Sequence, residues 1–289
     1  MNLKDTAGVR EIQRGELTLL EIRNEACTAL VSYQGAQVLS FIPNGGEDLL
    51  WLSEKAFYQK GKAIRGGVPL CFPWFGPHPE DGSKPAHGFA RNREWELVDI
   101  QADTESHRLR FRLEDDGQTR ALWPYHFLAE LEITLGTVLS IRLTVTNRSE
   151  QPLIISFALH SYFPVSDIHT THIQGLDGVH YIDQLQAGRP RRQQQGDISF
   201  AEETDRIYGD AGSSYQIAEI AASRSTHIRA ENCPSAIVWN PWVIKTQTLS
   251  DMEPGAWQRM VCVECGAAED NRITLAPGQQ SGHQLLIYR

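Results

Sequence analysis

An acidic side chain, Glu264, interrupts an otherwise apolar stretch near the end of the chain, MVCVECG at residues 260–266. Side chains alternate between the two faces of a strand, so Glu264 would share its face with Met260 and Cys262. Both faces are otherwise apolar, which is typical of a central strand covered on both sides. A carboxylate there must be paired or face a cavity, because its burial alone is costly. Two interpretations stay open: a structural ion pair with an arginine, or a carboxylate that does acid–base chemistry.

A histidine lies in a second apolar stretch, IISFALHSYF at residues 154–163. In a strand, the face of His160 would also carry Ser156, Ala158 and Tyr162, and its small residues leave room for a ligand. The opposite face carries bulky apolar side chains and is expected to be core. Histidine titrates close to neutral pH and is the natural general acid or base. The alternative is a histidine whose hydrogen bonds are satisfied within the core.

The strand that holds Glu264 also contains a formal C-x-x-C motif, formed by Cys262 and Cys265. A separation of three residues in a strand points the two sulfur atoms to opposite faces, which defeats chelation. The chain has no second C-x-x-C motif. We therefore expect structural thiols rather than a redox pair or a metal site.

The elements that must position these residues read mostly as strands. Residues 126–149 alternate polar and apolar side chains on both sides of a turn near Gly136, which is a hairpin signature. Residues 107–118 alternate and are expected to turn at Asp116 and Gly117. Few segments repeat at helical spacing, although short helical turns are possible at 53–61 and 230–237. The pattern predicts an all-β fold, a large antiparallel β-sandwich with few short helices, and we interpret 1–289 as a single domain.

The composition limits the partners and the compartment. A formal net charge of -9 argues against nucleic acid or an anionic membrane as the main partner. The polar N-terminal residues contain no signal-peptide core, and no apolar run is long enough to span a membrane. An odd number of cysteines, five, fits reduced thiols better than a disulfide framework. We therefore expect a cytoplasmic protein.

The segment RGGVPLCFPWFG at residues 65–76 combines paired glycines, two prolines, three aromatic residues and one arginine. The glycines allow a tight turn or a close backbone approach that would direct Arg65. The aromatic side chains Phe72, Trp74 and Phe75 could stack on a sugar ring or could belong to the core.

Six motifs follow one another along the chain: RGGVPLCFPWFG, HGFAR, ALHSYF, TDRIY, VWNPW and ECG. In this order they resemble the glucose-6-phosphate 1-epimerases, or hexose-6-phosphate mutarotases, of the aldose 1-epimerase superfamily. The resemblance implies a galactose mutarotase-like β-sandwich that acts on a small-molecule hexose 6-phosphate. It also implies no metal ion, no organic cofactor, and a monomer more often than an oligomer.

The resemblance assigns roles residue by residue. His160 and Glu264 match the catalytic pair, and the substrate-binding positions are Arg65, His87, Arg91 and Asp205. Ala86 stands where some members carry a substrate-binding glutamine, so the resemblance does not supply that contact. The arginines would hold the phosphate, since the guanidinium presents several donors in one plane. The nearby Lys84 and Arg93 are interpreted as solvated surface charges.

Anomer interconversion requires a base for the proton of the C1 hydroxyl and an acid for the ring oxygen. We assign Glu264 as the base and protonated His160 as the acid. Burial should raise the pKa of Glu264, and carboxylates in the cleft should favour charged His160. The pH–rate profile is then expected to be bell-shaped.

Three other functions are compatible with parts of this pattern. An epimerase for unphosphorylated aldoses such as galactose would use the same acid and base. A non-catalytic carbohydrate-binding β-sandwich would use the aromatic and arginine residues, but would not need a buried Glu264. A cupin-like metal enzyme would need a tight H-x-H pair with downstream ligands, which the ten histidines do not provide.

Overall fold

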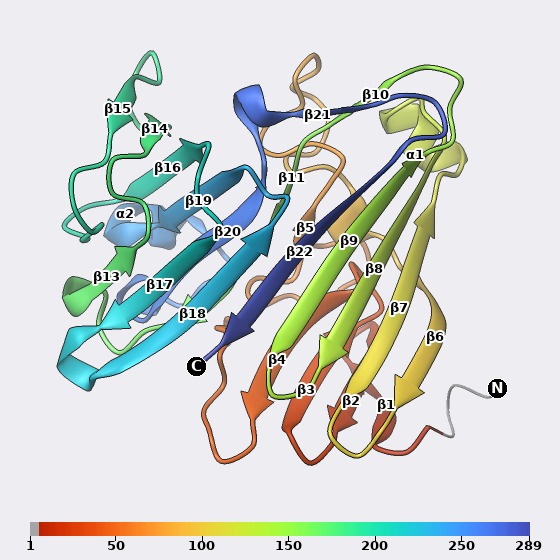
Figure 1. Ribbon diagram of the computed structural model, residues 1–289, viewed down its shortest axis with the longest axis horizontal. Coiled ribbons are helices and arrows are strands. Elements are labelled where there is room, and N and C mark those ends of the chain that lie inside the picture. The colour runs from red at the N-terminus through yellow and green to blue at the C-terminus, as the bar shows by residue number, and fades with distance from the viewer. Residues whose placement is uncertain (1–5) are drawn as a thin grey trace.

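The computed structural model describes residues 6–289, which form antiparallel sheets arranged in layers (Figure 1). The N-terminal sheet has the order β1-β2-β3-β4 and contains β1 (Val9–Arg14), β2 (Leu17–Arg23), β3 (Cys27–Ser32) and β4 (Gln37–Pro43). The site sheet has the order β15-β14-β16-β19-β20-β11-β5, with β12 also paired to β20. Its strands are β5 (Leu70–Cys71), β11 (Phe157–Leu159), β12 (Tyr162–Pro164), β14 (His180–Asp183), β15 (Arg191–Gln193), β16 (Thr204–Gly209), β19 (Ser235–Asn240) and β20 (Met260–Ala267).

The cover sheet has the order β13-β17-β18-β22-β9-β8-β7-β6. Its strands are β6 (Glu96–Ala102), β7 (His107–Glu114), β8 (Phe127–Leu135), β9 (Leu139–Asn147), β13 (Thr171–Gln174), β17 (Ser214–Glu219), β18 (Arg224–Glu231) and β22 (Gln280–Tyr288). A two-stranded ribbon joins β10 (Leu153–Ile155) and β21 (Ile273–Leu275). The helices are α1 (Gly117–Leu122) and α2 (Trp242–Thr248), with short 3-10 turns η2 (Ala90–Asn92), η3 (Ile168–Thr170), η4 (Ile220–Ala222), η5 (Ala256–Gln258) and η6 (Glu269–Asn271).

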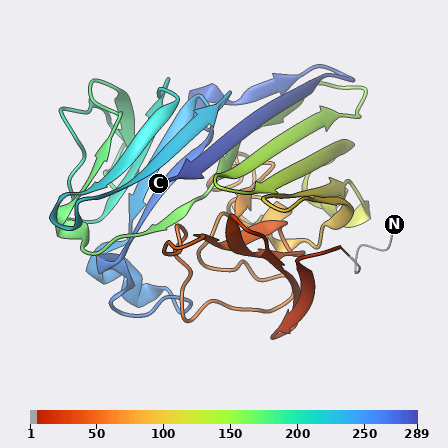
Figure 2. The ribbon, with the colours of Figure 1, turned by 60° about the horizontal axis from the view of Figure 1, so that its bottom comes forward.

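The cover sheet runs across one side of the molecule, and the N-terminal sheet packs beneath part of it (Figure 2). One hydrophobic cluster joins the inner faces of the three large sheets, with members such as Val31, Leu143 and Val263. The hairpin predicted around Gly136 is confirmed, because β8 and β9 pair from Phe127 opposite Asn147 onward and alternate buried and partly exposed residues. The predicted antiparallel β-sandwich is therefore correct.

Strand β20 is buried along its whole length, as expected for a central strand. Its two faces separate as the alternation predicts. Val261, Val263 and Cys265 lie in the main core, whereas Met260 and Cys262 pack in a smaller cluster on the other side. The second face is therefore the one that carries Glu264.

Some local expectations were wrong. Residues 53–61 form turns without a helix, and most of 230–237 is strand, because sheet pairing overrides the weak helical pattern there. The turn expected at Asp116 and Gly117 is the start of α1, whose N-cap is Asp116, and the chain then returns as β8 antiparallel to β7. The carboxylate of Asp116 accepts the Thr119 backbone N–H at 2.7 Å, and the Thr119 hydroxyl accepts the Asp116 N–H at 2.7 Å. This reciprocal cap is a sufficient helix start signal.

Within residues 6–289, none of the helices has the length and apolar character that crossing a membrane requires.

Candidate active site

A cavity of about 330 Å³ opens beside the site sheet, and it collects residues from distant parts of the chain. All six residues assigned as catalytic or substrate-binding line it: Arg65, His87, Arg91, His160, Asp205 and Glu264. Phe75 and several side chains that the sequence did not assign to the site complete the lining, among them Tyr162, Gln184, Trp239, Lys245 and Asp251.

Glu264 lies on β20 opposite Ile237 of β19, and its side chain is 1% exposed. Gly266, two residues after Glu264, lets the neighbouring strand β11 approach β20 closely. A Cβ at Gly266 would lie 2.0 Å from the carbonyl oxygen of Phe157 in β11. A larger residue would therefore push β11 away from β20, and His160 follows β11 directly.

His160 lies in the break between β11 and β12, where the chain leaves regular pairing. Its backbone N–H donates to the carbonyl oxygen of Pro69 at 2.9 Å, which ties it to the segment that follows Arg65. Its ring stacks on Tyr162, with centroids 4.8 Å apart and planes at 12°. These contacts fix both the position and the plane of the imidazole.

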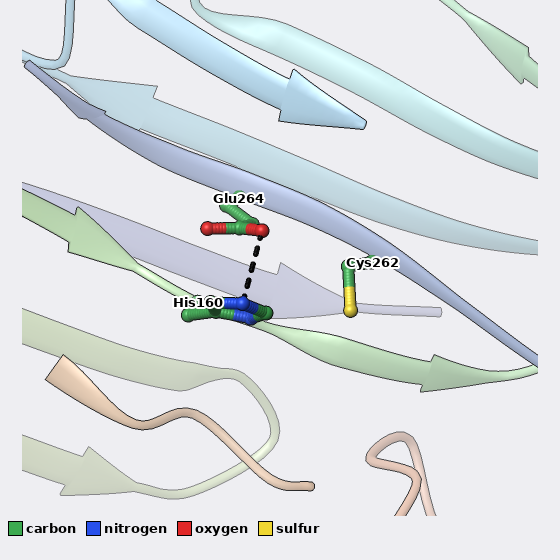
Figure 3. Close-up of side chains that lie close together, drawn as sticks. All are labelled: His160, Cys262 and Glu264. Atoms are coloured by element: carbon green, nitrogen blue, oxygen red, sulfur yellow. Dashed lines mark ion pairs between the residues drawn. The ribbon is translucent and has the colours of Figure 1, made fainter. Parts of the chain in front are cut away.

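The two candidate catalytic groups meet directly. The Nε2 atom of His160 lies 3.3 Å from Oε1 of Glu264 (Figure 3). Within residues 6–289, the remaining polar atoms, Nδ1 of His160 and Oε2 of Glu264, are buried without a hydrogen-bond partner. Buried polar atoms normally have partners, so these two are available to a ligand.

The surroundings of the pair favour its neutral form. Burial raises the pKa of Glu264 well above its usual range, and the charge of Asp205 adds to this effect against the charge of Arg91. Burial lowers the pKa of His160, with smaller contributions from His87, Arg91 and Arg65. The raised pKa of Glu264 agrees with the expectation, but the expectation of a charged His160 was wrong because burial and cations outweigh the carboxylates. In either form the pair shares one proton.

Arg65 is held in place by two partners. Its Nε and Nη2 atoms lie 3.1 Å from Oδ2 of Asp251, and Nη1 donates to the Tyr162 hydroxyl at 3.1 Å. The two glycines that follow Arg65 both have positive φ, at 117° for Gly66 and 62° for Gly67. A Cβ at Gly67 would lie 2.2 Å from the Val38 carbonyl oxygen, so the close approach is to the protein backbone.

His87 and Arg91 come from one tight loop. The backbone of His87 has a φ of 65°, and its Nδ1 accepts the Gly76 N–H at 3.3 Å. Burial and the charges of Arg91 and Arg65 lower the pKa of His87 to about 3, so its ring is neutral and Nε2 carries the proton. Arg91 donates to the carbonyl oxygen of Ala86 at 3.2 Å, and its Nε is buried without a partner in the described range.

Asp205 lies on β16 and accepts a hydrogen bond from Gln184 at 2.7 Å. Burial raises the pKa of Asp205 to about 6, although the Gln184 bond and the charge of Lys245 act in the opposite direction. Lys245 is exposed on α2 and also lines the cavity. The sequence carried no signal for Lys245, which lies on a short helix, or for Asp251, which lies in a turn.

Two aromatic residues offered for sugar stacking do not line the cavity. Phe72 is 0% exposed and packs against Trp123 and Phe127 in the main core. Trp74 is also core, and its Nε1 donates to the Pro85 carbonyl oxygen at 2.9 Å. Stacking by Phe72 and Trp74 was therefore a wrong expectation, since the core accounts for both. Phe75 is the member of this aromatic group that reaches the cavity.

A set of possible metal ligands combines the catalytic pair with a buried thiol that does not line the cavity. His160, Cys262 and Glu264 each offer one ligand atom, and these atoms lie within 4.8 Å of one another (Figure 3). Cys265 faces the main core on the other side of β20, so the C-x-x-C motif does not chelate, as predicted.

Comparisons with known proteins identify the family to which the chain belongs. The family model for aldose 1-epimerase matches residues 18–288. A Cenchrus ciliaris protein named "Putative glucose-6-phosphate 1-epimerase" is 36% identical over 269 residues, covering 88% of this chain and 79% of that protein. An Escherichia coli K12 protein of the same name is 34% identical over 260 residues, covering 90% and 86%.

Solved structures show the same fold. A structure titled "a putative mutarotase" from Salmonella typhimurium has a TM-score of 0.92 at 30% identity, covering 98% of this chain and 94% of that one. A galactose mutarotase related enzyme from Lactobacillus acidophilus has a TM-score of 0.70 at 16% identity, covering 97% and 96%. The galactose mutarotase-like fold expected from the sequence is thus confirmed, and the chain belongs to the aldose 1-epimerase family.

Proposed function

We propose that this chain interconverts the α and β anomers of hexose 6-phosphates, with glucose 6-phosphate as the principal substrate. Family membership and the names of the relatives support the reaction and the substrate class. The observation that carries the proposal is the contact of 3.3 Å between His160 and Glu264 in a cavity that also presents cationic side chains.

The chemistry requires two proton transfers at neighbouring oxygens of the sugar. The shared proton first moves from Glu264 to His160; Glu264, as carboxylate, then takes the proton of the C1 hydroxyl, and His160, as imidazolium, gives its proton to the ring oxygen. The C1–O5 bond breaks, and the aldehyde turns about the C1–C2 bond. The two transfers then run in reverse on the other face of C1. No covalent bond to the protein forms, and the pair ends with the proton that it had at the start.

The electrostatics of the cavity favour this sequence. Ring opening leaves Glu264 protonated and His160 neutral, which is the state that burial favours for both groups. Proton transfer in the direction of ring opening therefore removes two opposite charges from a site of low polarity.

The phosphate requires cations that are not already neutralised. Arg65 has Asp251 as its ion-pair partner, so its charge is largely balanced within the protein. In residues 6–289, neither Arg91 nor Lys245 has a carboxylate within ion-pair distance, although both line the cavity. We therefore assign Arg91 and Lys245 as the phosphate-binding cations and Arg65, His87 and Asp205 as contacts for the sugar.

The direct test is anomer exchange measured by NMR at equilibrium, with glucose 6-phosphate, glucose and galactose as separate substrates. We expect the highest kcat/KM with glucose 6-phosphate. A preference for galactose would instead support the sister activity on unphosphorylated aldoses. A wild type that exchanges anomers no faster than buffer alone would be a sugar-binding module. If His160→Asn and Glu264→Gln both exchange as fast as an active wild type, the catalytic assignment fails.

The phosphate assignment has its own test. Arg91→Met and Lys245→Met should each lower kcat/KM for glucose 6-phosphate by about 10- to 100-fold, as expected when a charged hydrogen bond is lost. The rate with glucose should change much less. Lys84→Met is the matched control, because Lys84 lies at a different surface pocket. Equal losses of kcat/KM with glucose 6-phosphate and glucose would show that these cations do not bind the phosphate.

The proposal also includes a cytoplasmic, monomeric protein whose residues 1–289 fold as one domain. Light scattering of the purified chain and the presence of one cooperative unfolding transition test the last two points.

A further inference from the structure

The proposed reaction leaves one buried group beside the catalytic pair without a role. Cys262 lies two residues before Glu264 on the same face of β20, and its thiol is buried beside the catalytic pair (Figure 3). Ring opening needs an acid and a base but no thiol. Its packing neighbours on that face are apolar or aromatic, and they include Tyr162 and Met260.

The three side chains match the ligand preferences and nearly match the spacing of a zinc site. A tetrahedral Zn²⁺ ion takes nitrogen, thiolate and carboxylate ligands at about 2.0–2.3 Å, which places those atoms roughly 3.4–3.6 Å apart. The ligand atoms here lie within 4.8 Å of one another, and the histidine and glutamate atoms are already 3.3 Å apart. Closure around an ion therefore requires a movement of roughly 1 Å, mainly of the thiol.

Charge and access favour the same ion. When a cation displaces their protons, the thiolate of Cys262 and the carboxylate of Glu264 carry two negative charges, which balance one divalent cation at a site whose other nearby charges include Arg91. His160 and Glu264 line the cavity, so an ion can reach them by the route that the sugar uses. Nitrogen and sulfur ligands select Zn²⁺ over Mg²⁺ or Ca²⁺, which prefer oxygen.

We propose that His160, Cys262 and Glu264 form an inhibitory site for a thiol-binding divalent cation such as Zn²⁺. The ion occupies the two groups that would transfer protons and leaves its fourth position open to the cavity. Inhibition is therefore competitive with the sugar, and it depends on a cysteine that takes no part in the reaction.

The strand provides a matched control. Cys265 is equally buried and lies three residues further along β20, but it faces the main core. A substitution of Cys265 thus removes a buried thiol from the same strand without touching the site. Comparison of Cys262→Ala and Cys262→Ser with Cys265→Ala isolates the effect of the thiol from that of a lost buried side chain.

The first experiment titrates Zn²⁺ and Mg²⁺ into the anomer-exchange assay, with each variant compared with its own metal-free rate. Zn²⁺ should inhibit the wild type and Cys265→Ala, and Mg²⁺ should not. Either substitution of Cys262 should raise the inhibition constant for Zn²⁺ by about tenfold or more, as the loss of a ligand predicts. Equal inhibition of wild type and both Cys262 variants, or no inhibition of the wild type, would overturn the proposal.

A second experiment does not depend on catalysis and therefore separates this proposal from the proposed function. Co²⁺ replaces Zn²⁺ in such sites, and its bond to a thiolate gives a near-ultraviolet charge-transfer absorption. The wild type and Cys265→Ala should show this band, and both Cys262 variants should lack it. A band that survives in the Cys262 variants would place the metal elsewhere and refute the site.

Discussion

Two buried glutamates of this protein, Glu219 and Glu264, have similar exposure but opposite surroundings. They are 3% and 1% exposed. Glu219 accepts hydrogen bonds from Arg224 Nε at 2.6 Å, from Arg224 Nη2 at 2.9 Å and from the Ser166 N–H at 2.6 Å. Glu264 has a single contact of 3.3 Å with His160, and within the described chain its second oxygen has no partner.

The pKa values of the two carboxyls move in opposite directions as a result. Burial alone would raise the pKa of Glu219, but the bonds from Arg224 and Ser166 outweigh it and hold the pKa below its usual range. The pKa of Glu264 is raised by burial and by Asp205, with too little compensation from Arg91. Burial does not decide the role of a carboxylate; its partners do. The ion-pair interpretation considered for Glu264 applies instead to Glu219.

The largest expected effect is on turnover. Glu264→Gln should lower kcat by about 1000-fold, because it removes a group that exchanges protons with the sugar. Glu219→Gln should leave kcat and KM close to wild type, since Glu219 does not line the cavity. Anomer exchange of glucose 6-phosphate measures both. Comparable losses of kcat in the two variants would remove the distinction between them.

The next-largest effect is on stability, and here Glu219→Gln should be the more damaging of the two substitutions. Glu219→Gln should lower the free energy of unfolding by about 2 kcal/mol, because charged hydrogen bonds from Arg224 are lost. Glu264→Gln should cost little or increase stability, since it replaces a poorly satisfied carboxyl with a neutral amide. Urea unfolding followed by tryptophan fluorescence gives both values. A larger loss in Glu264→Gln would show that its carboxyl is structural.

The two carboxyls should also respond to pH in opposite senses. Because the folded pKa of Glu264 lies above its usual value of 4.5, its stabilising contribution is complete below that pH and is lost as pH rises through the folded pKa. The folded pKa of Glu219 lies below 4.5, so its contribution is present above that pH and is lost as pH falls through the folded pKa.

Unfolding of the two Gln variants between acidic and neutral pH checks this sign. With rising pH, wild type should lose stability relative to Glu264→Gln by at most about 1.4 kcal/mol per pH unit. Over the acid range it should gain stability relative to Glu219→Gln. Parallel curves for both variants would contradict the assigned pKa directions.

The smallest expected effect concerns an exposed ion pair, which serves as a comparison for the buried Arg224–Glu219 pair. Arg112 also donates two hydrogen bonds to a glutamate, at 3.2 and 2.8 Å from Oε2 of Glu96, but the two side chains are 38% and 62% exposed. Water competes for such a pair. Glu96→Gln should therefore leave the urea midpoint unchanged within error, whereas a shift as large as that of Glu219→Gln would mean that burial is irrelevant.

The positions of Glu264 and His160 were predictable because the alternation of a strand is a local rule. It assigns each side chain to a face without knowledge of the partner strand. The same rule identified which face of β20 carries Cys262 and which carries Cys265. It could not say that Glu264 and His160 meet, because their contact depends on pairing between strands that are distant in sequence.

Other parts of the site depend on tertiary packing and could not be read from the sequence. Phe72 and Trp74 were offered for stacking on composition alone, but both fill the core. Lys245 lies on a helix that the sequence did not predict, and Asp251 lies in a turn. Neither residue belongs to a recognisable sequence pattern, because each becomes part of the site only when the folded chain brings it to the cavity. The capping box at Asp116 and Thr119 was readable, but the segment was interpreted only as a turn.

One feature of the backbone limits how this site can be redesigned. The Arg65 segment and the His160 segment exchange main-chain hydrogen bonds, from His160 N to the Pro69 oxygen and from Tyr162 N to the Gly67 oxygen, both at 2.9 Å. These bonds do not depend on side-chain identity, so the two segments form one structural unit that has to be transferred together. Transfer of the Arg65 segment to another scaffold must therefore include the His160 segment. Without it, His160 and Arg65 lose the backbone contacts that fix their relative position.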